Sequence, residues 1–355
     1  MLKNRKLLKE QLEGITNATT FIGLPQHMKK DGTMDRGAYA YSSDDQARFL
    51  QVWNRFPDFN NQEFQVIIPE KLLDYAEKVE RGDGLFENYV DERGRVVHSN
   101  KGEVYDVFGR WMLSFAEVSE SQNKMVSQRA NKLFENHLDA SKFLLEDPTP
   151  HSIAFLSLAL SEKLNGNERG SLTENVRRLR HEAISRLQEF YEEHSRPDWQ
   201  WVDDEVNYCG GRFPQAFLAA YSTGGNEAFL RIGESLLSHF TSVSFEKEMF
   251  WPVGNKGWFS RCGVKALYDQ QTIEAGVGAV AYNLAFQVTQ KQEYQRRRDA
   301  CIKYFSGKNS RGVSLLRNGG VCDAVTDSEE GVNTNQGAES RIAFLMAMST
   351  FPNDQ

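Results

Sequence analysis

Apolar residues along this chain recur in segments with helical spacing, and six of these segments are apolar on almost every side. They are rich in alanine and follow one another about every sixty residues; clear examples are Ile153–Leu164, Phe217–Tyr221, Gly276–Val288 and Ser340–Met348. A helix that is apolar nearly all round has to be surrounded by protein. This set is therefore predicted to be buried.

Six further segments alternate with the buried set and carry apolar residues only at positions i, i+3, i+4 and i+7, the spacing of an amphipathic helix. They are Asn4–Ile15, Pro69–Arg81, Lys124–Leu145, Ser171–His194, Asn226–Phe240 and Gln292–Ser306. Repeats of this length indicate repeated supersecondary units. Alternating buried and amphipathic helices close naturally into an inner ring within an outer ring. We therefore predict an all-α fold, an (α/α)6 barrel, with residues 1–355 as a single domain.

The connections fit this topology. Turns containing glycine, at Ser222–Asn226 and Asn165–Asn167, are expected to end two of the inner helices, because glycine readily takes a positive φ. Two short runs with β-branched residues, Phe64–Ile68 and Val313–Leu316, are candidates for extended segments.

A polar cluster precedes each buried helix. The six clusters are Ser42–Arg48, Gly102–Arg110, Pro148–Ser152, Asp203–Gln215, Tyr268–Gly276 and Asn333–Ser340. If all inner helices begin at one face of the barrel, these clusters converge there, and the helix dipoles favour anionic side chains around the opening. We call this face the mouth and expect the site there.

Composition narrows the class of partner. The net charge of −7 argues against nucleic acid, whose recognition needs a basic surface, and is compatible with a neutral or cationic small ligand. No stretch reaches the eighteen or so apolar residues of a membrane span, and the first residues lack the apolar core of a signal peptide, so no membrane association and a cytoplasmic location are expected.

The cysteines and histidines give no metal-site spacing. Cys209, Cys262, Cys301 and Cys322 are far apart and are expected to be free thiols. The seven histidines are dispersed, without an HxH or HExxH pair. We expect no metal and no other cofactor.

The first two clusters each contain an aspartate and an arginine four residues apart: Asp44 and Arg48, then Asp106 and Arg110. Side chains at this spacing share one helix face. They are either ligand-binding groups or capping and first-turn aspartates paired with an arginine, which needs no substrate. Asp45 points about 100° away from Asp44 and is the better candidate to face the mouth.

Two aromatic segments precede the later clusters. The first, Trp199–Tyr208, combines Trp201, Glu205 and Asn207 and is followed by Arg212; the second contains Trp258. Aromatic faces beside acidic and amide groups suit sugar rings, whose C–H faces stack while their hydroxyls form hydrogen bonds. Alternatively, the tryptophans anchor the loops against the barrel.

Acidic residues recur at the starts of the last two inner helices. Asp269 lies at the expected cap of one, where Gln270 and Glu274 share a face. An apolar environment would raise the pKa of Glu274 and suit it to proton donation. The alternative is a buried glutamate bonded to loop amides. In the last cluster Asn335 and Glu339 are again four residues apart, and Asp323 lies upstream.

These clusters resemble a bacterial helical domain that is often attached to glycosyltransferases and belongs to the six-hairpin glycosidase-like superfamily. The resemblance rests on Gly37–Arg48 (GAYAYSSDDQAR), Phe86–Tyr89 (FENY), Asp106–Arg110 (DVFGR), Asn207–Gln215 (NYCGGRFPQ), Pro252–Trp258 (PVGNKGW), Asp269–Glu274 (DQQTIE) and Asn333–Ser340 (NTNQGAES). It implies an (α/α)6 barrel, a carbohydrate ligand and a cleft lined by these residues. It also suggests a glycosyltransferase as a partner.

The leading hypothesis is a glycoside hydrolase or phosphorylase in which two carboxyl groups flank the scissile bond. The acid and base are expected among Glu205, Asp269, Glu274 and Glu339. Substrate binding is assigned to Asp44, Asp45, Arg48, Asp106, Arg110, Trp201, Asn207, Arg212, Trp258, Gln270, Asp323 and Asn335. One alternative is a noncatalytic saccharide-binding domain that assists a glycosyltransferase. Another is a lyase or epimerase, which would need a Tyr/His or His pair; His98 and His151 are the plausible histidines.

Overall fold

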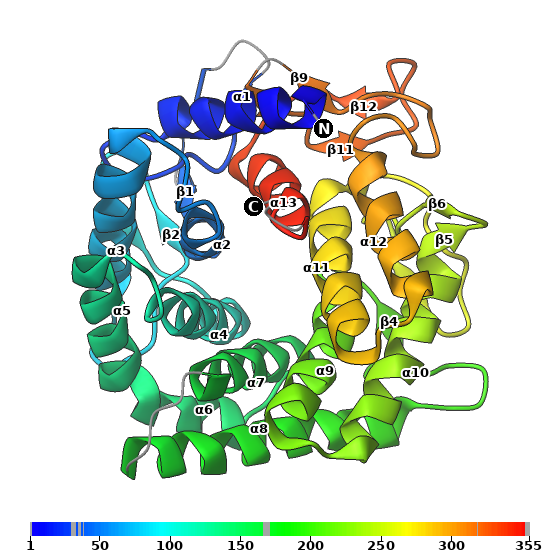
Figure 1. Ribbon diagram of the computed structural model, residues 1–355, viewed down its shortest axis with the longest axis horizontal. Coiled ribbons are helices and arrows are strands. Elements are labelled where there is room, and N and C mark those ends of the chain that lie inside the picture. The colour runs from blue at the N-terminus through cyan, green and yellow to red at the C-terminus, as the bar shows by residue number, and fades with distance from the viewer. Residues whose placement is uncertain are drawn as a thin grey trace.

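Two concentric rings of helices surround a common axis, which confirms the predicted (α/α)6 barrel (Figure 1). The computed structural model describes residues 2–29, 33–34, 37, 39–165, 171–317 and 319–351. The inner ring consists of α2 (Ser43–Asn54), α4 (Lys101–Val118), α7 (Pro150–Asn165), α9 (Arg212–Gly224), α11 (Thr272–Thr289) and α13 (Ala338–Met348). The outer ring consists of α1 (Leu2–Ala18), α3 (Ile68–Val79), α5 (Lys124–His137) with the short α6 (Ser141–Glu146), α8 (Ser171–His194), α10 (Glu227–Ser244) and α12 (Gln292–Tyr304).

Neighbouring inner helices pack at backbone contact distance. A Cβ on Gly109 of α4 would lie 2.7 Å from the Cβ of Phe155 in α7. A Cβ on Gly276 of α11 would lie 2.6 Å from the carbonyl oxygen of Ala343 in α13. The small residues of the apolar segments therefore allow the ring to close tightly.

The outer helices bury one face each, as their periodicity predicts. In α3, for example, Ile68, Leu72, Ala76 and Val79 are fully buried. The predicted glycine turn after α9 is confirmed, because Gly225 caps this helix with φ of 68°. The other predicted turn, Asn165–Asn167, lies largely outside the described residues.

Short strands fix the starts of several inner helices. Each is two residues long and pairs antiparallel with its neighbour. Three sheets lie beside inner-helix starts: β1 (Tyr41–Ser42), β2 (Tyr89–Val90) and β3 (Val96–Val97); β4 (Glu205–Val206) with β7 (Phe259–Ser260); and β8 (Gln270–Gln271), β11 (Ala324–Val325) and β12 (Val332–Asn333). The remaining pairs are β5 (Phe245–Glu246) with β6 (Met249–Phe250) and β9 (Leu316–Arg317) with β10 (Gly320–Val321). Because β1 and β8 run directly into α2 and α11, their pairing sets where these helices begin.

Three local predictions differ from the structure. Phe64–Ile68 is not extended, since Glu63–Ile67 is a π-helical turn that continues into α3. Of Val313–Leu316, only Leu316 belongs to a strand. Finally, α4 begins at Lys101 and not near Asp106, because Asn100 and Glu103 form a reciprocal capping box one turn earlier.

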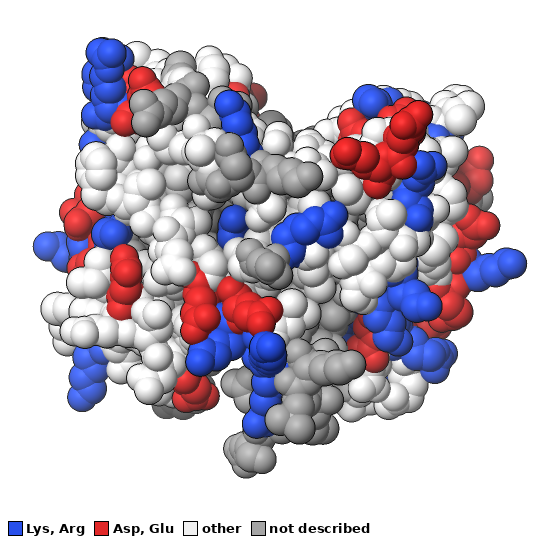
Figure 2. Space-filling model, turned by 90° about the horizontal axis from the view of Figure 1, so that it is seen from above, with Lys and Arg blue, Asp and Glu red and all other residues white. Residues whose placement is uncertain are grey.

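The surface agrees with the composition. On the face shown in Figure 2, basic and acidic side chains are interspersed with uncharged surface. In the part of the chain that the structure describes, no helix has the length and apolar character needed to cross a bilayer.

Candidate active site

The starts of the inner helices meet at one end of the barrel, where two buried arginines link the polar clusters. Arg48 of α2 contacts Glu339 of α13, and the Tyr208 loop ahead of α9 also reaches it. Arg110 of α4 pairs with Asp44 of α2. Residues remote in the sequence therefore form one connected site at the mouth.

Arg48 holds three carboxylates. Its Nη1 atom lies 3.1 Å from Asp45 Oδ1 and 3.4 Å from Glu339 Oε2, and its Nη2 atom lies 3.1 Å from Asp44 Oδ2. The same Nη2 donates to the Tyr208 hydroxyl at 2.9 Å. The Arg48 side chain is only 2% exposed, whereas those of Asp44 and Glu339 are 25% and 31% exposed. The cation therefore lies beneath the carboxylates that solvent and ligand reach.

Arg110 continues this alternation of charges. Besides its ion pair with Asp44, its Nη2 atom lies 3.9 Å from Asp106 Oδ2. Its guanidinium stacks over Phe155 at 4.0 Å and faces the Tyr208 ring at 5.1 Å. Glu339, Arg48, Asp44, Arg110 and Asp106 thus form a continuous chain in which acids and cations alternate.

The two aspartates of α2 have the reverse of their expected positions. Asp45 was expected to face the mouth, but it is buried, and Ser42 donates a hydrogen bond of 2.7 Å to its carboxylate. Burial raises the pKa of Asp45 to about 7, although Arg48 opposes this increase. Asp44 instead reaches the opening, where its side chain is 25% exposed, because the bond to the cap residue Ser42 holds Asp45 inward.

Burial also perturbs the other acids of the mouth. It raises the pKa of Glu339, against the effect of Arg48. It likewise raises the pKa of Asp106, which His151 and Arg110 oppose. Glu339 and Asp106 therefore retain protons to higher pH than ordinary carboxyl groups, and both are partly exposed.

His151, at the start of α7, joins the site through Tyr208. Its Nε2 atom lies 2.6 Å from the Tyr208 carbonyl oxygen and therefore donates to it, and the two rings lie 5.7 Å apart. Burial lowers the pKa of His151, which keeps the imidazole neutral. The other candidate histidine, His98, has a 94% exposed side chain and pairs with Glu87.

Glu274 lies in the first turn of α11 and is only 4% exposed. Its Oε1 atom accepts a hydrogen bond of 2.6 Å from the backbone amide of Cys209, a residue in left-handed conformation with φ of 56°. Burial raises its pKa to about 8, although this backbone hydrogen bond opposes the increase. Glu274 is thus bonded to a loop amide, as one sequence-based alternative expects, and burial raises its pKa, as the other expects. Its role as a proton donor stays a prediction.

Several predicted residues make their contacts elsewhere. Glu205 lies in β4 and bonds to Ser260 at 3.3 Å and to Asn207 at 3.4 Å. Asp269 is not the cap of α11, since that position is Gln271; it pairs with Lys256 at 3.6 Å. Among the described residues, the hydrogen bonds and ion pairs of these two acids do not reach the arginine chain described above.

The expected helical pairings of Gln270 and Asn335 are wrong. Gln270 lies in β8, outside α11, and its buried amide donates to the Leu267 carbonyl and the Ser310 hydroxyl. Asn335 is exposed and precedes α13, which starts at Ala338, so it does not share a helix face with Glu339.

Both candidate tryptophans pack against the protein interior. Trp201 is fully buried against Phe213, His239 and Phe240, which leaves no face of its indole for a sugar. Trp258 is half-buried with φ of 51° and packs against the core.

Asp323 and Arg212 are the last two predicted site residues, and both contact neighbouring protein groups. Asp323 accepts from the Gly337 amide at 2.7 Å and the Ser340 hydroxyl at 2.8 Å, so it fixes the start of α13. Arg212 is buried, donates to Gln215 at 2.8 Å and faces the Phe155 ring that Arg110 also contacts.

Sequence reasoning did not assign Tyr208 or Phe155 to the site. Tyr208 is adjacent to the candidate Asn207, and its position within a polar cluster was the available signal. Phe155 has no such signal, because its packing against two arginines is visible only in three dimensions. Within the described ranges, no group of three or more His, Cys, Asp or Glu side chains is placed to hold a metal ion.

Comparisons with known proteins identify the fold. No protein-family model and no curated protein sequence matches the chain. Among solved structures, a sugar epimerase from a ruminal bacterium superimposes with a TM-score of 0.68 at 12% identity, covering 99% of this chain and 98% of the epimerase. The cellobiose 2-epimerase of Bacillus thermoamylovorans gives 0.70 at 10% identity, with 98% and 99% of the chains covered.

A glycosidase has the same architecture. The GH76 α-mannanase of Bacteroides thetaiotaomicron gives a TM-score of 0.62 at 12% identity, over 97% of this chain and 94% of the mannanase. At such identities the likeness establishes the (α/α)6 fold and not the reaction, since proteins with one fold host unrelated chemistries.

Proposed function

We propose that the protein cleaves glycosidic bonds of a saccharide bound at the mouth, with Glu339 as proton donor and Asp44 as the second carboxyl group of the pair. The observation that carries this proposal is the arrangement around Arg48: one buried guanidinium contacts both partly exposed carboxyl groups, on its two separate nitrogens. The two contacts of 3.1 Å and 3.4 Å to one guanidinium hold the two carboxyl groups near each other. Glycosidases need such proximity, because their two carboxyl groups flank the scissile bond at about 5–10 Å.

The environments of the two acids differ in the direction that acid and base roles require. Burial raises the pKa of Glu339, which favours the protonated form that donates to a leaving oxygen. Asp44 is contacted by two guanidinium groups and by the Tyr208 hydroxyl at 3.4 Å, so its negative charge is compensated. Titratable pairs whose surroundings separate their protonation states are the usual acid and base of such sites.

The rest of the mouth suits a sugar. Asp106 and Tyr208 present hydrogen-bonding groups beside Asp44, and hydroxyls of a saccharide can donate to the carboxylates. The proteins of similar structure also support this ligand class, because a sugar epimerase, a D-mannose isomerase and a glycoside hydrolase share the barrel. A glycosyltransferase as a physical partner stays a proposal that rests on the sequence resemblance.

Two isosteric substitutions test the assignment. Asp44→Asn and Glu339→Gln should each lower turnover by about a hundredfold or more, the usual contribution of a general acid or base. Release of reducing sugar or sugar phosphate from a glycan panel, with and without phosphate, separates hydrolysis from phosphorolysis. Asp327→Asn is the matched control, because Asp327 is exposed and pairs with Lys256 away from the arginines.

Unchanged turnover in both variants would refute these roles. If the wild-type protein binds saccharides saturably but turns over none of them, the noncatalytic binding domain replaces the enzyme.

A second candidate is a sugar epimerase or isomerase, which the position of His151 favours, because its ring lies 5.7 Å from the Tyr208 ring at the mouth. A neutral imidazole beside Asp106 could take a proton from carbon next to a carbonyl. Incubation of free sugars in D2O distinguishes the two reactions. Epimerisation incorporates deuterium at carbon and depends on His151, whereas glycoside cleavage does neither.

A further inference from the structure

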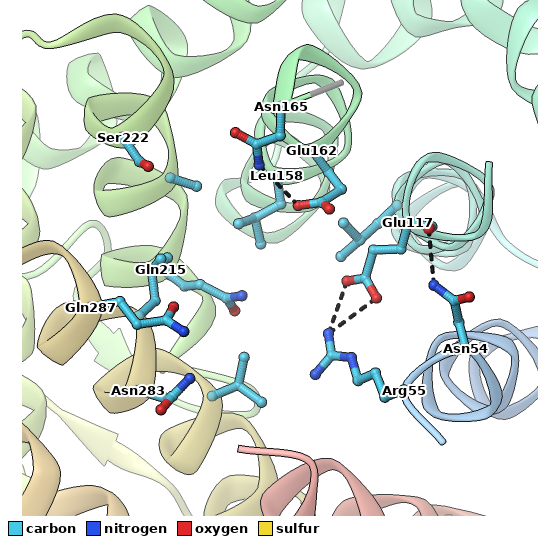
Figure 3. Close-up of a pocket in the computed structure, with 14 residues that line it drawn as sticks. Asn54, Arg55, Glu117, Leu158, Glu162, Asn165, Gln215, Ser222, Asn283 and Gln287 are labelled. Atoms are coloured by element: carbon cyan, nitrogen blue, oxygen red, sulfur yellow. Dashed lines mark hydrogen bonds and ion pairs between the residues drawn. The ribbon is translucent and has the colours of Figure 1, made fainter. Parts of the chain in front are cut away.

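A polar cavity of about 320 Å³ opens at the opposite end of the barrel from the mouth (Figure 3). It is lined by the last residues of α2, by the middle and later turns of α4, α7 and α11, and by α9 from Gln215 in its first turn to Ser222. Its polar lining includes Arg55, Glu117, Glu162, Gln215, Asn283 and Gln287. None of these residues belongs to the arginine chain at the mouth.

The charge in this cavity is unbalanced. Arg55 is already engaged, since its Nη2 atom lies 3.0 and 3.1 Å from the two oxygens of Glu117. Glu162 forms no ion pair with any described residue; the amide of Asn165, at 3.3 Å, is its hydrogen-bond partner. The carboxyl ends of the inner helices add further negative potential here. Among the described residues that line the cavity, two carboxyl groups, Glu117 and Glu162, therefore face one cation, Arg55.

The pKa of Glu162 is raised in this environment. Burial raises its pKa to about 7, Glu117 on α4 adds to the increase, Arg55 opposes it, and Glu120 contributes from the end of α4. Above this pH Glu162 is an ionised carboxylate at the cavity, and none of the residues that the structure describes forms an ion pair with it.

Amide groups provide the second, independent feature. Gln215 is only 8% exposed, and its Oε1 atom accepts from Arg212. Its Nε2 atom has no hydrogen-bond partner among the described residues, and Figure 3 shows the side chain reaching into the cavity. Asn283 likewise uses its Oδ1 atom to accept from Arg298 at 3.1 Å, which leaves its amide NH2 for another acceptor.

We propose that this cavity is a second ligand site, which binds a small polyol bearing a primary ammonium group. The ammonium pairs with Glu162, and the hydroxyl oxygens accept from the amides of Gln215, Asn283 and Gln287. A volume near the lower end of small-molecule pockets, about 300–1,000 Å³, suits a ligand of monosaccharide size. The inference does not depend on glycoside chemistry at the mouth.

Calorimetric titration of the full chain with 1-amino-1-deoxysorbitol at pH 8 tests the proposal, with sorbitol as the matched ligand. An alkylamine stays protonated at this pH, while Glu162 is ionised. We expect saturable binding of the amine, at least about tenfold tighter than that of sorbitol. Affinity should weaken between pH 8 and pH 6, as Glu162 takes up its proton.

Variants locate the site. Glu162→Gln should lower amine affinity about tenfold or more and abolish its pH dependence, because a buried charge pair is lost. Glu248→Gln, an exposed acid that neither lines the cavity nor shifts the pKa of Glu162, should leave affinity unchanged. Gln287→Ala, at an exposed position that does not threaten folding, should weaken both ligands a few-fold.

Three results would overturn the proposal. The first is no saturable binding up to about 10 mM ligand, about ten times the dissociation constant of 1 mM that marks weak binding. The second is equal amine affinity in Glu162→Gln and wild type, with circular dichroism confirming that both are folded. The third is loss of amine binding in Asp44→Asn, which would place the ammonium in the acidic mouth instead.

Discussion

Replacing Glu274 with glutamine probes a strongly buried acid of the mouth. The carboxyl is 4% exposed, accepts from the Cys209 amide and has a pKa raised by burial to about 8, against an ordinary value of 4.5. Between these two values the folded protein keeps a proton that the unfolded chain has released. Stability therefore falls as the pH rises through this window, because the folded state binds more protons. The destabilisation is absent below pH 4.5 and complete above pH 8.

The size of the effect follows from the pKa shift. Each unit corresponds to about 1.4 kcal/mol, which sets an upper limit of about 5 kcal/mol for this group. Structural relaxation and entry of water around the ionised form reduce it, so we expect about 2–4 kcal/mol at pH 8. Glutamine stays neutral at every pH, and its carbonyl oxygen can still accept from Cys209. Glu274→Gln should consequently match the wild type within about 1 kcal/mol at pH 5 and exceed it by about 2–4 kcal/mol at pH 8.

Urea unfolding at pH 5, 6, 7 and 8 measures this difference. Glu248→Gln serves as the control, because its side chain is 75% exposed and its substitution should give a difference that is flat with pH. A stability difference for Glu274→Gln that does not change with pH, or a variant less stable than wild type at pH 8, refutes the reasoning. Turnover measured on the same folded variant separates the two roles of Glu274: retained activity assigns it to shaping the Cys209 loop, and lost activity assigns it to proton donation.

Other substitutions test the packing and charges that build the site. Arg48→Met should destabilise the protein by about 3–5 kcal/mol at pH 7, since it leaves buried carboxylates without their cation; the loss should shrink at pH 5 in urea unfolding, as those carboxylates gain protons. Gly276→Ala should lower the free energy of unfolding by about 1–3 kcal/mol in thermal unfolding, because its Cβ would lie 2.6 Å from the Ala343 carbonyl oxygen. In the same assay Gly102→Ala should be neutral or stabilising, because the nearest atom to its Cβ would lie at 3.5 Å. Trp201→Ala should cost about 3–5 kcal/mol by loss of core packing, and a melting temperature equal to wild type would contradict its place in the core.

Periodicity predicted the barrel because burial dictates it locally. An inner helix such as α11 has to be apolar all round, and an outer helix such as α8 has to be apolar on one face, wherever the chain later places them. The expected segment Ser171–His194 coincides with α8, and most of the other expected segments overlap one observed helix. Lys124–Leu145 is instead divided, because a 3-10 turn at Leu138–Ala140 separates α5 from α6. Ring closure then follows from alternation alone.

The site was less predictable, because side-chain direction depends on the residue at which a helix starts. Asp44 and Asp45 do point different ways, but Ser42 caps α2 and bonds to Asp45, which turns Asp45 inward and leaves Asp44 at the opening. For Glu205 and Asp269 the decisive contacts are loop and strand pairings between distant segments, such as β4 with β7. Helical periodicity carries no information about such pairings.

The charges of the mouth also bear on the kind of ligand it accepts. Six helix starts supply positive potential, which favours the carboxylates gathered there. The cations that balance these carboxylates, Arg48 and Arg110, are enclosed beneath them. Arg48 also donates to the Tyr208 hydroxyl, and Arg110 faces the rings of Phe155 and Tyr208. A ligand therefore meets carboxyl oxygens first, and an anionic one would bring like charge beside Asp44 without reaching an arginine. A neutral polyhydroxylated ligand can instead donate hydrogen bonds to these oxygens, which is why the geometry favours a sugar without an acidic group over a uronic acid or a phosphorylated one.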